Sequence, residues 1–271
     1  MTLRTTPAEA AAGSPATPGS AATGGTGGAG ASPLLRVSGL AVAYGPTTVL
    51  DDVSFDVAPG ELLAFLGANG SGKSTTLRAV AGLTPHQGGE IEIGGEHGRP
   101  AIVFQKIHLV ARRSVLDNVC AGALARMPVA ASLHPWFYPA EIRREAMVAL
   151  DRVGLADKAP LRAGTLSGGQ QQRVAIARAL CQGAEVLLAD EPVAALDPEA
   201  ARTVMGLLRD LAHDEGLAVA AVLHQPDLAR EFADTIIGLR SGGIVLRGRA
   251  DEVPAEEITG LYTPVTNSES K

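Results

Sequence analysis

The sequence predicts an α/β fold with a parallel core sheet, an antiparallel β edge and an inserted α-helical subdomain. Two short apolar runs, Val186–Ala189 and Leu217–Leu223, flank a helical pattern over Pro198–Ala212, which is typical of parallel strands buried on both faces. Earlier in the chain, an apolar strand over Glu61–Leu66 leads into a glycine-rich loop, after which a helix is expected over residues 73–82. Strand, loop and helix in this order indicate the parallel core.

The antiparallel edge is predicted from alternation of side chains. Leu34–Tyr44 and Thr48–Val57 are rich in β-branched and apolar residues and alternate roughly at period two, as antiparallel strands do. The other expected strands are short: Ile91–Ile93, Ala101–Phe104, Ile236–Leu239 and Ile244–Arg247. Ser241-Gly242-Gly243 joins the last two and is a hairpin signal.

Residues 106–183 are expected to be mainly helical. Ser114, with Asp117 three residues on, resembles a helix cap. Pro139–Val153 reads as an amphipathic helix, with the apolar positions Ile142, Met147, Val148 and Leu150. Gln170–Leu180 is a further helix, with the apolar positions Val174, Ile176 and Leu180.

Residues 1–33 differ in composition from the rest of the 271-residue chain. All of them except Met1, Leu3, Arg4 and Glu9 are Ala, Gly, Ser, Thr or Pro. Such a segment has too little apolar surface to offset the entropy lost on ordering, so we expect a disordered tail, either a tether or a dispensable extension. Residues 34–271 are expected to form one domain, with its helical subdomain at about 106–183.

Composition excludes several classes of protein. Hydrophobic residues make up 46% of the chain but aromatic residues only 3%, so aliphatic side chains must fill the core. The formal charge of −6, with no Lys/Arg run, argues against a nucleic-acid partner. Cys120 and Cys181 are expected to be reduced structural thiols of a cytosolic protein. No apolar run reaches the roughly 18–20 residues that cross a bilayer, so in a transport system other subunits would supply the pore.

The glycine-rich loop fits the pattern Gly-x-x-x-x-Gly-Lys-Ser, in the strand–loop–helix context that a phosphate-binding loop requires. Glycines let backbone N–H groups converge on phosphates, and the helix N-terminus adds partial positive charge. Lys73 can reach the β- and γ-phosphates, and the Ser74 hydroxyl can ligate Mg²⁺. The alternative is an ordinary glycine-rich turn. The residues predicted to bind nucleotide are Gly67, Ala68, Asn69, Gly70, Ser71, Gly72, Lys73, Ser74 and Thr75.

Two acidic residues close the apolar strand over Val186–Ala189. Asp190 can hold Mg²⁺ opposite Ser74, and Glu191 can polarise an attacking water as a general base. An Asp-Glu pair at a strand end is often only a solvated turn. Its position after a phosphate loop favours the catalytic interpretation.

Leu166-Ser167-Gly168-Gly169-Gln170 matches the signature sequence of the ATP-binding cassette (ABC) family of P-loop NTPases, and the chain resembles this family from residue 34 to about 250. The resemblance implies a role for each matching motif. Tyr44 would stack on adenine, Gln105 would sense Mg²⁺ and the water and couple to a membrane subunit, and His224 would contact the γ-phosphate. Taken singly, these three residues could be a core tyrosine, a strand cap and a structural histidine.

The resemblance also implies a dimer. Residues of the signature, Ser167, Gly168, Gly169 and Gln170, would complete the nucleotide site of a second copy, and Ala194–Asp197 matches the loop that crosses between subunits. The chain has one phosphate loop and one signature, so a head-to-tail homodimer is the simplest assembly. Binding of ATP with Mg²⁺ would join the two copies, and hydrolysis would release them.

Within the family, the chain is most similar to phosphonate-import ATPases. The similar stretches include Leu109–Val119, Trp136, Ile236–Arg240 and Leu261-Tyr262, whereas Pro226 departs from the usual pattern. The resemblance implies an ATPase at the cytoplasmic face of the membrane, partnered by permease subunits and, indirectly, by an extracytoplasmic substrate-binding protein. Import of another solute (amino acid or metal chelate), a non-transport ABC ATPase and a nucleotide-regulated binding module remain alternatives.

Overall fold

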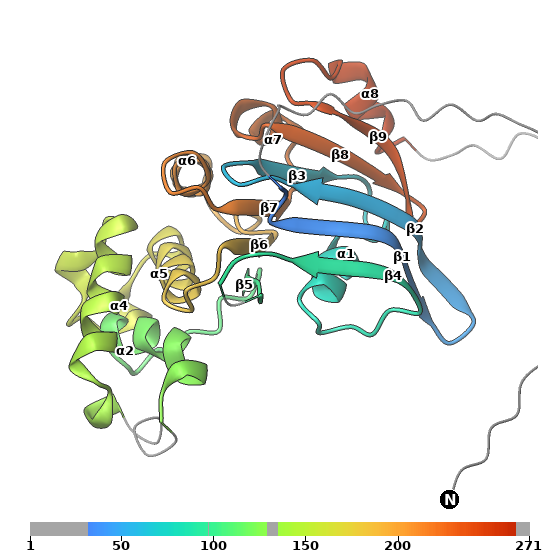
Figure 1. Cartoon of the computed structure of the whole chain (residues 1–271). Coiled ribbons are helices and arrows are strands. Elements are labelled where there is room, and N and C mark those ends of the chain that lie inside the picture. Colours follow the sequence, from blue (N-terminus) through green and yellow to red (C-terminus); the bar gives the residue numbers. More distant parts are fainter. Residues whose placement is uncertain (1–31, 97, 129–134, 264–271) are drawn as a thin grey trace, which may run out of the picture. The chain divides into compact units, whose positions relative to one another are not determined.

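A six-stranded sheet forms the centre of the unit Ala31–Lys271 (Figure 1). The computed structural model describes residues 32–96, 98–128 and 135–263, so most of the predicted tail over 1–33 lies outside the described residues. Five strands are parallel to their neighbours and the last is antiparallel. In spatial order they are β5 (Ala101–Val103), β6 (Val186–Asp190), β7 (Ala218–Val222), β3 (Leu62–Leu66), β8 (Thr235–Arg240) and β9 (Gly243–Arg249). The predicted parallel core and the β8–β9 hairpin are confirmed.

A second, antiparallel sheet has three strands in the order β2-β1-β4. They are β1 (Leu35–Tyr44), β2 (Thr47–Val57) and β4 (Gly88–Ile93). Leu35 pairs with Val57 in β2 and with Ile93 in β4, so the predicted antiparallel edge is also confirmed. The alternation of side chains in β1 and β2 puts their apolar faces into the core.

The side chains of β3 divide the core into two layers. Leu62, Ala64 and Leu66 pack with one hydrophobic cluster, which includes residues of every described α-helix except Lys73–Val80. Leu63 and Phe65 pack with the other, which includes β1, β2 and the helix Lys73–Val80. All five residues are fully buried. Such burial on both faces explains why the strand is a continuous apolar run rather than an alternating one.

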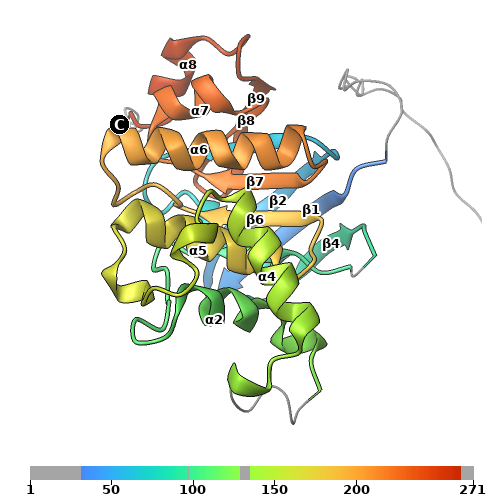
Figure 2. The same ribbon diagram turned by 90° about the vertical axis from the view of Figure 1, so that its left-hand side faces the viewer.

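Seven α-helices have described bounds: α1 (Lys73–Val80), α2 (Val115–Cys120), α4 (Ala140–Arg152), α5 (Gly168–Leu180), α6 (Pro198–His213), α7 (Pro226–Phe232) and α8 (Ala255–Gly260). Four short 3₁₀ turns, Ala121–Arg126, Pro135–Phe137, Ala156–Lys158 and Ala163–Thr165, complete the helical segment. Helix α5 contacts β5, and α2 and α4 pack against it on the side away from the sheet (Figures 1 and 2). The helical segment is thus attached to the core through α5.

Local sequence signals were mostly right in this region. The Ser114 hydroxyl caps α2 by accepting a hydrogen bond from the Asp117 amide at 3.0 Å. One of the apolar positions named in α4 is not buried: Val148 is 49% exposed, whereas Ala146 and Ala149 are buried. Helix α4 packs against α2 and α5, and both alanines belong to the hydrophobic cluster that these helices share.

Both cysteine thiols lie in the interior of the fold. Cys120 and Cys181 are free and buried. Burial raises the pKa of the Cys120 thiol to about 12 and that of Cys181 to about 11, so both stay protonated at neutral pH and are unreactive.

In the part of the chain that the structure describes, no helix has the length and apolar character needed to traverse a bilayer.

Candidate nucleotide-binding site

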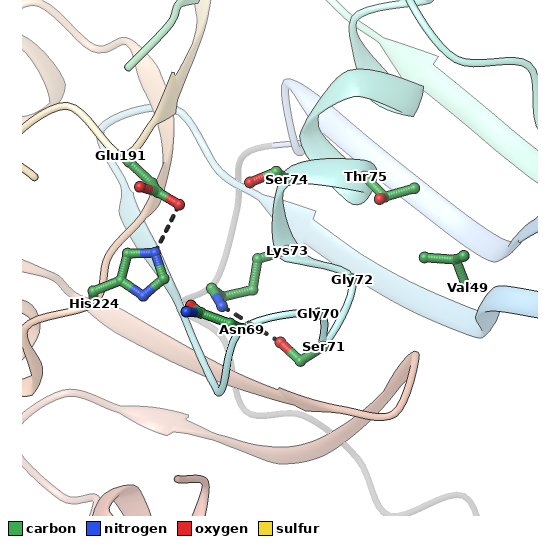
Figure 3. A pocket seen from close by; sticks show the side chains of 10 residues that line it. All are labelled: Val49, Asn69, Gly70, Ser71, Gly72, Lys73, Ser74, Thr75, Glu191 and His224. Atoms are coloured by element: carbon green, nitrogen blue, oxygen red, sulfur yellow. Dashed lines mark hydrogen bonds and ion pairs between the residues drawn. The ribbon is translucent and has the colours of Figure 1, made fainter. Parts of the chain in front are cut away.

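The phosphate loop joins β3 to α1 and borders a pocket of about 520 Å³ (Figure 3). Glu191 and His224 follow β6 and β7, so the carboxyl ends of two parallel strands face the loop. Open α/β sheets commonly bind ligands at this edge. The residues that line the pocket are Val49, Asn69, Gly70, Ser71, Gly72, Lys73, Ser74, Thr75, Glu191 and His224.

Two positions of the loop, the first and the last glycine, require glycine. Gly67 has a φ of 144°, a conformation that side chains rarely adopt, and a Cβ there would lie 2.2 Å from the Leu239 carbonyl oxygen. Gly72, at φ 106°, caps the N-terminus of α1, and its Cβ would lie 2.5 Å from the Leu50 side chain. The loop can therefore reach this shape only with its glycines in place.

We expect Gly67→Ala to lower the free energy of unfolding by at least about 2 kcal/mol, because the substitution adds a backbone clash to an unfavourable φ. Chemical denaturation of the purified chain measures this change. Gly260→Ala is the control, since a Cβ there meets no atom within 4 Å. Equal stability of the two variants would contradict the role given to Gly67.

Lys73 is the buried cation of the pocket. It is 4% exposed, and its ammonium donates hydrogen bonds to the carbonyl oxygens of Gly67 at 2.8 Å and Ala68 at 3.0 Å. Burial lowers the pKa of Lys73, and the charges of Glu191 and Asp190 offset this in part. A triphosphate would bring the compensating negative charge, so the residue is prepared to exchange carbonyl contacts for phosphate contacts.

Asp190 lies beneath the loop rather than in the pocket lining. Its Oδ1 accepts a hydrogen bond from the Ser74 hydroxyl at 2.6 Å, and Arg78 approaches its Oδ2 at 3.4 Å. Asp190 is 3% exposed. Hydroxyl and carboxylate oxygens are the ligands that Mg²⁺ prefers, so Ser74 and Asp190 could hold the metal together with phosphate oxygens.

Glu191 and His224 form a close pair on the far side of the pocket from the loop (Figure 3). The His224 Nε2 lies 2.6 Å from the Glu191 Oε1. Glu191 has a φ of 54°, which costs on the order of 1–3 kcal/mol in a residue with a side chain. With this backbone conformation the Glu191 side chain lines the pocket beside His224 (Figure 3).

We expect His224→Ala to lower the turnover number for ATP about 10²-fold while changing KM for ATP only a few-fold. The reason is that His224 holds the Glu191 carboxylate, whereas the loop supplies most of the binding contacts. Steady-state kinetics of the purified chain separate the two constants. Wild-type turnover in this variant would show that His224 has no role in hydrolysis.

The signature segment lies at the N-terminus of α5, outside the phosphate-loop pocket. Ser167 and Gln170 form a reciprocal capping box: the Ser167 hydroxyl accepts from the Gln170 amide at 3.3 Å, and the Gln170 side chain accepts from the Ser167 amide at 3.1 Å. Ser167 and Gly168 are exposed. The exposed N-terminus of this 13-residue helix has backbone amides that could bind a phosphate.

Two predicted residues lie away from the pocket. Tyr44 is 53% exposed, so it is not a core tyrosine, and its hydroxyl lies 3.5 Å from that of Thr84. Gln105 is exposed in the bend after β5 and is not among the residues that line the pocket. The structure therefore brings together Lys73, Ser74, Asp190, Glu191 and His224, but not these two side chains.

Sequence reasoning missed two residues at the site. Val49, in β2, lines the pocket, and Arg78, one turn into α1, contacts the predicted metal-binding carboxylate. A lone valine in a strand carries no signal of this kind. Arg78 could have been found, because residues four apart on a helix share one face and Ser74 was already assigned.

The fold and this pocket together define an ATP-binding cassette. The family model for the ABC transporter matches residues 50–194. A phosphonates import ATP-binding protein, PhnC, from Frankia casuarinae is 48% identical over 240 residues, which cover 84% of this chain and 94% of that protein. The protein of the same name from Halobacterium salinarum is 41% identical over 233 residues, covering 84% and 83%. The chain belongs to the ABC transporter family.

Solved structures agree with this assignment. The ADP conformation of MJ1267, an ATP-binding cassette of an ABC transporter, has a TM-score of 0.72 and 26% identity, and the match covers 84% of this chain and 94% of that one. A dimeric structure of MJ0796, a bacterial ABC transporter cassette, has a TM-score of 0.66 and 29% identity, covering 81% and 100%. The chain therefore has the fold of an ATP-binding subunit.

Proposed function

We propose that this chain is the ATPase subunit of an importer, and that it couples ATP hydrolysis to uptake of phosphonate or a related phosphorus oxyanion. The observation that supports the ATPase is the placement of the Glu191–His224 pair across one pocket from Lys73. The observation that supports the substrate class is the 48% identity to a phosphonates import ATP-binding protein. The two can be tested separately.

In this proposal the chain binds MgATP through the phosphate loop. Backbone amides of residues 67–75 surround the phosphates, and Lys73 leaves its two carbonyl partners to contact the β- and γ-phosphates. Ser74 and Asp190 hold Mg²⁺, which neutralises charge on the phosphate oxygens when bound. From the family resemblance, Tyr44 is proposed to stack on adenine, and its exposed ring is accessible for this contact. Gln105 is proposed to reach the metal and the water when the dimer closes.

Hydrolysis is assigned to the pair at the strand ends. Glu191 accepts a proton from the attacking water as general base, and its strained backbone keeps the carboxylate oriented. His224 fixes the carboxylate through its Nε2 and contacts the γ-phosphate. The buried Lys73 stabilises the charge that develops on the phosphoryl oxygens.

A complete site is proposed to need two copies of the chain. The exposed N-terminus of α5 offers the amides of Gly168, Gly169 and Gln170 and the Ser167 hydroxyl to a triphosphate held by the partner's loop. That the similar cassette MJ0796 has a dimeric structure supports an assembly of two copies. Two equivalent sites would then form across one two-fold axis.

The proposed partners follow from the word import in the names of the relatives. Permease subunits would supply the path through the membrane, and an extracytoplasmic binding protein would deliver the solute to them. The ATPase would lie at the cytoplasmic face of the membrane as a peripheral subunit. Residues after β5, including Gln105, are proposed to transmit closure of the dimer to the permease.

Uptake by cells tests the substrate. We expect a strain that lacks this chain to stop accumulating radiolabelled methylphosphonate, and the wild-type gene but not Glu191→Gln to restore uptake. Labelled phosphite, glutamate and an iron chelate serve as comparison solutes. Normal methylphosphonate uptake together with lost uptake of an amino acid or chelate would contradict the phosphonate assignment. Normal uptake of all four would favour an ABC ATPase that serves no importer.

A further inference from the structure

Tyr44, the last residue of β1, lies one strand away from the lining of the nucleotide pocket. Its partner in the β1–β2 pairing is Thr47, and Val49, two residues further along β2, lines the pocket. The Val49 carbonyl oxygen lies beside the phosphate loop, because a Cβ added at Gly72 would be 3.2 Å from it. The end of β1 is therefore attached to the loop through β2.

A glutamine side chain on the other side of β1 holds the residue that precedes Tyr44. Gln87 comes directly before β4, and its Oε1 accepts a hydrogen bond from the Ala43 amide at 2.7 Å. Its Nε2 donates to the Ala43 carbonyl at 3.4 Å, so the side chain exchanges both bonds with Ala43, as a residue of a neighbouring strand would. The Gln87 backbone amide also donates to the Ala41 carbonyl at 2.9 Å. Gln87 thereby extends the β1–β4 pairing up to the residue before Tyr44.

The segment that carries Gln87 also contacts the Tyr44 side chain. Residues 81–87 join α1 to β4, and the hydroxyl of Thr84 in this segment lies 3.5 Å from the Tyr44 hydroxyl. Thr84 is 8% exposed, and its amide donates to the Arg78 carbonyl at 3.2 Å, in the last turn of α1. Because α1 begins at Lys73, a single helix connects the phosphate loop to the segment that holds Tyr44.

These contacts reduce the freedom of an aromatic ring that is otherwise half in solvent. Tyr44 is 53% exposed, and the two residues that follow it form the turn to β2. An exposed side chain that must be immobilised when a ligand binds lowers the affinity for that ligand. Contacts that fix the strand end beforehand remove part of this loss.

We propose that Gln87 is a positioning residue for the nucleotide base, which holds the end of β1 so that the ring of Tyr44 is in place to stack on adenine. This inference rests on the proposed function, specifically on stacking by Tyr44, and is independent of the transported substrate. Gln87 is not among the residues that line the pocket, so it acts through Tyr44. Its effect falls on the base and leaves the contacts of the phosphate loop unchanged.

Gln87→Leu tests the proposal, because it approximately keeps the size of the side chain and removes both hydrogen bonds to Ala43. We expect the purified full-length variant to bind ATP about 2- to 5-fold more weakly by calorimetry, since hydrogen bonds of an exposed side chain contribute at the lower end of the usual range. KM for ATP should rise by the same factor, with kcat at saturating ATP within about 2-fold of wild type. Inorganic triphosphate has no base, and it should bind with wild-type affinity.

Two further variants separate positioning from a general loss of stability. Gln182→Leu is the matched control, because Gln182 lies after the C-terminus of α5 and outside the nucleotide pocket, and it should keep wild-type ATP affinity. Tyr44→Ala should weaken ATP binding by itself. In a chain that already carries Tyr44→Ala, Gln87→Leu should cause no further loss, because residues that act through one another are not additive.

Four results would overturn the proposal. Wild-type ATP affinity in Gln87→Leu, with weaker binding in Tyr44→Ala, would leave stacking in place without help from Gln87. Equal weakening of ATP and inorganic triphosphate would indicate damage to the phosphate loop or to the fold. Additive losses in the double variant would show that Gln87 does not act through Tyr44. Wild-type affinity in both single variants would contradict the proposed stacking as well, so the two failures are distinguishable.

Discussion

We expect Glu191→Gln to bind ATP with at least wild-type affinity and to hydrolyse it about 10²- to 10⁴-fold more slowly. The amide keeps the size of the side chain and removes the base. It also removes a negative charge from a pocket that must accept a triphosphate, so binding does not suffer. Without hydrolysis the closed dimer persists, and light scattering should detect twice the mass of the chain.

A remote glutamate gives the matched control. Glu215 pairs with Arg152 at 3.2 Å, outside the nucleotide pocket, so Glu215→Gln should hydrolyse ATP at the wild-type rate. Hydrolysis by Glu191→Gln at a rate near that of the wild type would show that another group is the general base. Complete loss of ATP binding would instead indicate that Glu191 has a structural role.

The second large effect is expected at Lys73. Lys73→Ala should weaken ATP binding by roughly 10- to 150-fold, because it removes charge-assisted hydrogen bonds worth about 1.5–3 kcal/mol, and it should abolish measurable hydrolysis. Titration with a fluorescent ATP analogue measures the affinity. The loss follows from the position of the ammonium, which is buried in the loop and within 3.0 Å of two of its carbonyls.

Removing an ordinary lysine should have little effect. Lys158 pairs with Asp157 on the surface at 2.9 Å, and such exposed pairs contribute little to stability. Lys158→Ala should therefore keep wild-type ATP affinity. If Lys73→Ala bound ATP as well as this control, the pocket described here would not be the nucleotide site.

The core of the fold was predictable because its signals are local. Val186–Ala189 and Leu62–Leu66 are apolar on both faces, which only a covered parallel sheet satisfies, and the chain continues from them to Glu191 and to the phosphate loop that border the pocket. The Ser167–Gln170 capping box starts α5 two residues before the helix expected from residue 170. The positions of Lys73, Ser74, Asp190 and Glu191 follow from the same strand ends.

Other features depended on contacts that the sequence does not display. Helix α7 was not predicted, although Pro226 at its first turn is well placed to begin a helix, since its missing amide hydrogen has no partner there in any case. Helix α8 was missed for lack of a clear apolar period. The hydrogen bond from the Leu62 amide to the Asp234 carboxylate joins residues 172 positions apart, and no local pattern reports such a contact.

The sequence also did not predict that Tyr44 and Gln105 lie outside the pocket lining. Both side chains are exposed. Their proposed roles rest on the family resemblance. The pair Glu191–His224, by contrast, is already formed in the folded chain at 2.6 Å.

Mixing two inactive variants tests the two-copy site most directly. Lys73→Ala damages the loop and Ser167→Arg damages the signature, so a mixed dimer has one doubly damaged site and one intact site. With random pairing and independent sites, we expect the mixture to recover about a quarter of the wild-type rate of ATP hydrolysis. A mixture no more active than the separate variants would contradict a site shared between two copies.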